Sequence, residues 1–131
     1  MDRNQEMRIA QALNEAIHLR DHADEISQEA LIIAIKNLAQ YGIFSARQLS
    51  AICNGRLSHH GVTKLINKTD KTGGNLNAGT LDILRSILYS RANGVTDYDL
   101  VADAISAGTS QGMVSKLTGI PQGSISKKMK P

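Results

Sequence analysis

The sequence Gly-Ile-Pro at 119–121, between two short amphipathic stretches, constrains the fold more than any other feature. Glycine tolerates the left-handed backbone conformation in which many helices end. Proline has a φ angle already suited to the first turn of a helix, and it lacks an N–H group that would be unpaired there. The pattern therefore predicts a helix over Gln111–Thr118, a tight turn, and a second helix over Gln122–Met129.

The second predicted helix has one buried side and one polar side. Val114 and Ile125 are expected to pack between the two helices, and the small Ser115 allows the helices to approach. The residues left on the outside are Gln122, Gly123, Ser124, Ser126, Lys127 and Lys130. Amide and hydroxyl groups hydrogen-bond to base edges and lysines contact phosphates, so this face is predicted to bind double-stranded DNA. The alternative is an ordinary helical hairpin with a solvated lysine face.

Residues 111–131 resemble the helix-turn-helix of the resolvase/invertase DNA-binding tail and of many small bacterial regulators. The resemblance implies that the second helix is the recognition helix, which lies in the major groove. Thr118 and Lys128 stand where an apolar residue is commoner, and Met129 is expected to pack in place of Lys128. Upstream, Thr96 and Asp99 predict a capping box that starts one more helix, so residues 93–131 form a three-helix unit.

A second helix pair is predicted at about 45–67. Ser45 and Ser58 are the expected N-caps of its two helices, and Asn54-Gly55 is a turn dipeptide between them. The turn is about two residues longer than in the usual motif. The residues expected to lead the second helix of this pair into a groove are Ser58, His59, His60, Thr63 and Lys64. For the two histidines, a role as exposed cap residues is an equally favoured alternative.

The basic, glycine-containing stretch 68–77 follows this pair. Lys68 and Lys71 are predicted to contact phosphates there, and the stretch lacks the spacing of a nucleotide-binding P-loop. Helix, helix pair, glycine-bearing loop and closing helix follow one another over 30–91. This order, with Gly74, Thr80 and Leu81, resembles the DNA-binding domain of lambda-type phage repressors and Cro. The resemblance implies a DNA-binding N-terminal domain.

The predicted fold class is all-α: two small helix-turn-helix units in tandem, preceded by an amphipathic helix. Aromatic residues make up 3% of the chain, so the core must be aliphatic, which suits packed helices. Residues 3–22 carry an apolar stripe that must be buried in the same domain or on a second copy of the chain. Residues 30–40 are apolar on nearly all sides and predict a central helix. The expected domains are 1–92 and 93–131.

Charge is distributed unevenly along the chain. Residues 1–44 hold four Lys or Arg against seven Asp or Glu, whereas residues 45–131 hold eleven against five. A basic C-terminal part favours a polyanionic partner over a merely solvated surface. The chain shows no membrane-spanning run and no signal peptide, so a cytoplasmic location without a membrane partner is expected.

Motifs for catalysis and metal binding are not found. The chain lacks G-x-S-x-G, HExxH and CxxC, and a recombinase would need a further catalytic domain. His18 and His22 lie four residues apart but lack partner ligands, and the lone Cys53 is expected in the core. We therefore expect no enzyme, no metal and no cofactor.

These features predict a sequence-specific DNA-binding transcriptional regulator, a repressor of the phage immunity-repressor kind that acts by covering a promoter. Its partner would be double-stranded DNA. Two helix pairs in one chain could read a two-part, non-palindromic site as a monomer, and the alternative is a homodimer formed through the N-terminal helix. Two alternatives stay open. One is a phage DNA-packaging or recombination accessory protein, such as a small terminase subunit or an excisionase-like factor. The other is a protein-interaction module.

Overall fold

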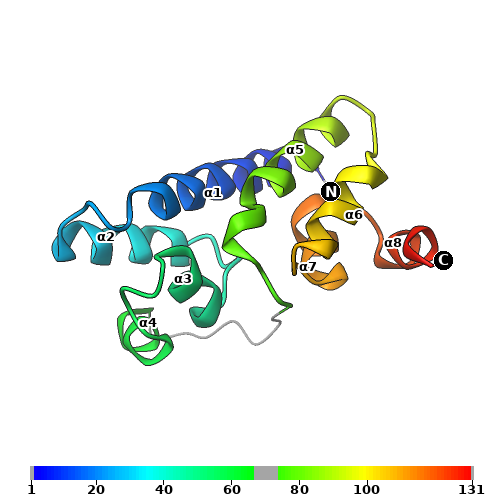
Figure 1. The fold of residues 1–131 in the computed structure, drawn as a ribbon. Coiled ribbons are helices and arrows are strands. Elements are labelled where there is room, and N and C mark those ends of the chain that lie inside the picture. The colour runs from blue at the N-terminus through cyan, green and yellow to red at the C-terminus, as the bar shows by residue number, and fades with distance from the viewer. Residues whose placement is uncertain (1, 67–73, 131) are drawn as a thin grey trace.

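The computed structural model describes residues 2–66 and 74–130, and these ranges contain helices and no strand. The predicted all-α class is confirmed. No helix among these residues is both long and apolar enough to cross a membrane. The elements, drawn in Figure 1, are α1 (Arg3–His22), α2 (Gln28–Ala39), α3 (Ala46–Ile52), α4 (His59–Ile66), the 3-10 helix η1 (Ala78–Thr80), α5 (Leu81–Ala92), α6 (Tyr98–Ser106), α7 (Gln111–Thr118) and α8 (Gln122–Met129).

The ends of several helices follow from local signals. α1, α7 and α8 begin and end at the residues that the sequence predicts. Gly119 has a φ of 78°, in the left-handed region, and it ends α7 as expected. Ser45 caps α3, and its partner in a capping box is Gln48, which the sequence analysis did not identify. Asn77 caps η1 by accepting a hydrogen bond from the Gly79 amide at 2.8 Å.

The predicted capping box at Thr96 is wrong. α6 is capped by Asp97, whose Oδ1 accepts hydrogen bonds from the Asp99 and Leu100 amides at 3.1 and 3.2 Å. The Thr96 hydroxyl oxygen instead accepts a hydrogen bond from the Arg91 guanidinium at 3.0 Å. The Asp97 carboxylate, one residue after Thr96, accepts from the free amides at the start of α6. The Thr96 hydroxyl is therefore available to the Arg91 side chain of α5.

The central helix is α5, not α2. Figure 1 shows α5 between the α1–α4 side of the molecule and the α6–α8 side, and it packs against α1, α6 and α7. The prediction of a central helix over 30–40 is wrong, because Ile33 is 60% exposed. α2 lies at one end of the molecule and buries only the side that carries Leu31, Ile35 and Leu38. The apolar composition of residues 30–40 therefore did not predict the position of this helix in the fold.

The apolar stripe of α1 is buried within the same chain. Ile9, Leu13, Ala16 and Ile17 all belong to the core, where α1 packs mainly against α5 and also against α2 and α3. This arrangement satisfies the stripe without a second copy of the chain. The predicted homodimer through this helix stays a prediction.

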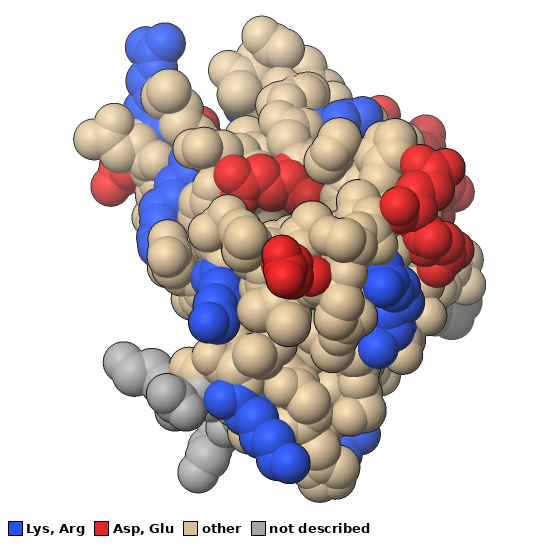
Figure 2. All heavy atoms as spheres, turned by 90° about the vertical axis from the view of Figure 1, so that its left-hand side faces the viewer, with Lys and Arg blue, Asp and Glu red and all other residues tan. Residues whose placement is uncertain are grey.

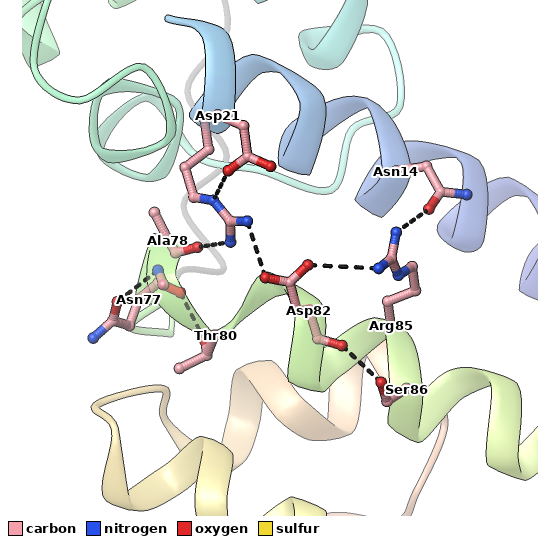
Figure 3. Close-up of polar contacts among 10 residues, drawn as sticks. Asn14, Asp21, Asn77, Ala78, Thr80, Asp82, Arg85 and Ser86 are labelled. Atoms are coloured by element: carbon pink, nitrogen blue, oxygen red, sulfur yellow. Dashed lines mark hydrogen bonds and ion pairs between the residues drawn. The ribbon is translucent and has the colours of Figure 1, made fainter.

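Polar contacts fix the end of α1 against the start of α5, as Figure 3 shows. The guanidinium of Arg20 donates to the Ala78 carbonyl and to the Asp82 carboxylate, each at 2.9 Å, and to Asp21 at 2.9 Å. The bond from Arg20 holds the pKa of Asp21 below its ordinary value of 3.8. Asp82 also pairs with Arg85 at 3.5 Å, and Arg85 donates to Asn14 on α1 at 3.1 Å.

One cluster of buried apolar side chains includes residues from both sides of the predicted domain boundary at 92. α5, from the N-terminal side, packs against α6 and α7 from the C-terminal side. Whether 1–92 and 93–131 are separate folding domains stays a prediction. Their helices nevertheless share a continuous core in the folded chain.

Candidate nucleic-acid interface

The last three helices form a compact unit around the predicted tight turn. α7 and α8 pack against each other, and α6 packs against both. Ile125, the expected apolar anchor of α8, is fully buried, as is Val114 on α7. Across the turn, the Ser115 hydroxyl donates to the Ile120 carbonyl at 2.6 Å. Ser115 therefore holds the turn closed as well as allowing close packing.

The two residues that depart from the usual pattern are accommodated differently. Thr118 is buried, and its hydroxyl donates to the Val114 carbonyl at 2.6 Å, so its polar atom is satisfied inside the core. Lys128 is exposed, and its Nζ lies 5.3 Å from the centre of the Tyr98 ring on α6. Met129 packs against the core in place of Lys128, as predicted.

The outer face of α8 is polar and basic. Four of the predicted residues are exposed and two are half-buried; the exposed ones are Gln122, Gly123, Lys127 and Lys130, and the half-buried ones are Ser124 and Ser126. The Ser126 hydroxyl donates to the Gln111 side-chain oxygen at 2.9 Å. Ser126 therefore presents an oriented hydroxyl oxygen rather than a freely rotating group.

Gln111 is a residue of this face that the sequence analysis missed. It is the first residue of α7, and its bond to Ser126 places its amide beside α8. In helix-turn-helix proteins the first helix crosses the DNA backbone. A polar side chain at the start of that helix is the signal that could have identified it.

α3 and α4 form the second helix pair, and α2 packs against both of them. α3 ends at Ile52 and α4 begins at His59, so the turn is long, as predicted. The longer turn accommodates Arg56, whose Nη1 donates to the Ala23 and Ile26 carbonyls at 2.6 and 2.7 Å. This arginine anchors the turn to the α1–α2 connection, so its charge is directed inward and away from the α4 face.

The predicted residues of α4 lie on one end of the molecule. Ser58, His60 and Lys64 are exposed, and His59 and Thr63 are half-buried. The Ser58 hydroxyl caps the helix by accepting from the Gly61 amide at 3.1 Å, and Thr63 donates to the His59 carbonyl at 2.9 Å. Two of these five side chains, Ser58 and Thr63, therefore already make hydrogen bonds to the backbone of their own helix.

The charged side chains are unevenly distributed over the end of the molecule that carries α2 and α4. Figure 2 views the side on which α2 and α4 lie in Figure 1. Acidic and basic side chains are mixed over the upper and middle parts of this face, whereas the charged side chains in the lower part, at the level of α4, are basic. The basic side chains give the surface around α4 a positive charge that would attract a polyanion.

The predicted site residues form two separate patches. Figure 1 places α4 and α8 at opposite ends of the molecule, with α5 between them. Lys68 and Lys71, the remaining predicted residues, lie outside the described residues. The structure therefore brings together the residues of each helix but does not bring the two helices together.

A groove between α1 and α2 lies apart from both patches. It encloses about 460 Å³ and has an apolar floor that includes Leu19, Ala34 and Leu38. His18 and His22 lie on its rim with their ring centres 4.5 Å apart. Within 2–66 and 74–130 no three His, Cys, Asp or Glu side chains are grouped as metal ligands would be.

The chain matches no protein-family model, and no curated protein or solved structure is significantly similar to it. What its surface does is therefore inferred from the chemistry and placement of its own residues.

Proposed function

We propose that this protein is a sequence-specific double-stranded DNA-binding regulator that uses α8 as its recognition helix. The activity would be repression, in which the bound protein covers a promoter. Double-stranded DNA is then its partner, and the cytoplasm is where it would act.

One observation carries the proposal: the exposed face of α8 holds amide, hydroxyl and lysine side chains, while the opposite side of the helix is packed into the core. Gln122 stands exposed at the first turn of the helix, where residues of a recognition helix contact base edges. Lys127 and Lys130 are exposed near its end, where they can contact phosphates. The buried Ile125 fixes the opposite side of the helix to α7 and α6.

The α4 patch supports the same function from the other end of the molecule. It also starts a helix with polar residues, and its charged surroundings are basic (Figure 2). A homodimer formed through α1 would use the outer side of that helix, where Met7 is 62% exposed, because the inner stripe is buried.

Selection of bound sequences from a random pool of DNA duplexes tests the proposal. A regulator enriches a consensus, and its affinity for that consensus falls steeply as salt is raised, because phosphate contacts release counterions. The mass of the complex on the selected duplex then gives the number of chains bound. If no sequence is enriched and binding is insensitive to salt, the proposed function is wrong.

A further inference from the structure

We propose that the two helix pairs are fixed to each other as one rigid body, so that the DNA target is a two-part site with a single permitted spacing. This inference rests on the proposed function. It concerns how α4 and α8 are placed relative to one another, and it follows from the contacts between the two halves of the chain.

The first contact is made by Gln48 on α3. It is a buried polar residue, only 4% exposed, and it belongs to the capping box that starts α3. Its Nε2 donates to the Gly74 carbonyl at 2.6 Å and lies 3.6 Å from the Met113 sulfur on α7. One side chain therefore links the first helix of the N-terminal pair to the first helix of the C-terminal pair.

The second contact is the close approach of Gly74 to α7. A Cβ atom at this position would collide with the Ser110 hydroxyl and would lie 3.1 Å from the Met113 backbone nitrogen. The next residue, Asn75, accepts a hydrogen bond from the Ser110 amide at 2.8 Å. Only glycine allows the backbone to lie this close to the start of α7.

Further bonds cross between the two halves. Lys116 on α7 donates to the Ile43 carbonyl at 3.0 Å, and Asn77 donates from its amide side chain to the Ala107 carbonyl. On the other side of α5, Arg91 reaches the Gly119 carbonyl of the α7–α8 turn at 3.5 Å. These bonds surround the apolar contact of α5 with α6 and α7, so neither pair can swing without breaking buried contacts.

Rigid coupling has a consequence that a flexible tether lacks. Each added base pair moves the second part of a DNA site by about 3.4 Å and turns it by roughly a tenth of a helical turn. A protein with flexibly joined units follows such changes, and an insertion of about ten base pairs, which restores the angle, is the most easily tolerated. A rigid protein cannot adjust to either the shift or the rotation, so it cannot contact both parts of the lengthened site at once.

The test is a spacing series on the selected DNA site, with the wild-type full-length chain. Insertions of one, five and ten base pairs are placed between the two parts of the consensus, and affinity is compared with a duplex in which one part is scrambled. We expect every insertion, including ten base pairs, to lower affinity to that of the scrambled duplex, a loss of about tenfold or more. Affinity that survives the insertions would overturn the rigid coupling.

Other outcomes separate this inference from the proposed function. A consensus with one part, or a palindrome bound by two chains, would overturn the two-part site while DNA binding stands. Absence of any enriched sequence would overturn both.

A Gly74→Ala variant tests the joint itself. It is expected to lose about tenfold or more on the two-part site and to bind a single-part site as the wild type does, because the substitution alters none of the DNA-facing residues of α4 or α8. Ser86→Ala, on the exposed face of α5, is the control and should bind both sites as the wild type does. Unchanged two-part binding by a folded Gly74→Ala chain would show that this contact does not set the geometry.

Discussion

The buried hydroxyls of Thr80 and Thr109 lie 2.6 Å apart and close a ring of hydrogen bonds on the backbone of Asn77. The Asn77 amide donates to Thr109 at 3.3 Å, and the Thr80 hydroxyl donates to the Asn77 carbonyl at 2.7 Å. Each hydroxyl has one proton, so Thr109 must be the donor between the two threonines. The ring joins the start of α5 to the α6–α7 connection.

The ring predicts that Thr109→Val destabilises the fold. The substitution leaves the Asn77 amide without an acceptor and the buried Thr80 oxygen without a donor, which costs about 1–3 kcal/mol in the free energy of unfolding. Denaturant unfolding of Thr80→Val, Thr109→Val and the double variant measures the coupling. We expect the double variant to lose less than the two single variants together, and strict additivity would contradict the ring.

The left-handed turn between α7 and α8 predicts opposite outcomes for two glycines. Gly119 has a φ of 78°, so Gly119→Ala is expected to destabilise the fold by about 1–2 kcal/mol. Gly112, in the first turn of α7, has only the flexible Gln122 side chain near its absent Cβ, at 3.9 Å. Gly112→Ala should be neutral or stabilising by less than about 1 kcal/mol. Thermal unfolding of the two variants compares them directly.

The basic end of α8 predicts a change in salt dependence. Lys127→Ala with Lys130→Ala should weaken binding to all DNA sequences, and the slope of log affinity against log salt should fall by about 2 in magnitude. Arg3→Ala is the control, because this exposed basic residue lies on α1, outside both the α4 and the α8 patches. Titrations at several salt concentrations measure the slopes, and an unchanged slope would remove both lysines from the interface.

The first turn of α8 predicts a change in specificity. Gln122→Ala should cost about 1–3 kcal/mol of binding free energy on the preferred sequence and little on unrelated DNA, if its amide reads a base. Gln11→Ala, an exposed glutamine on α1, is the control. Equal losses on both kinds of DNA would mean that Gln122 contacts the backbone instead.

The Arg20–Asp21 pair predicts a pH-dependent contribution to stability. Because the pKa of Asp21 is lowered below 3.8 in the folded chain, the contribution is present above that pH and is lost as the pH falls through the folded pKa. Asp21→Asn should therefore be less stable than the wild type near neutral pH, and the difference should disappear in strong acid. Urea unfolding at a series of pH values checks this, and a constant difference would contradict it.

Signals that act within a few residues were readable in the sequence. Gly119 ends α7 because it adopts the left-handed backbone conformation, and Ser45 starts α3 because its side chain accepts a hydrogen bond from a backbone amide three residues later. The bounds of α1, α7 and α8, the all-α class and the exposure of Gln122 and Lys127 follow from the same short-range patterns. These properties depend on local geometry, which the order of residues along a helix specifies.

The tertiary structure alone decided which helix is central and where the two patches lie. Ile33 is exposed because α2 has neighbours on one side only. The joint between Gln48 and Gly74 pairs residues 26 positions apart. Such contacts depend on how whole helices pack against one another, and no local pattern encodes that packing.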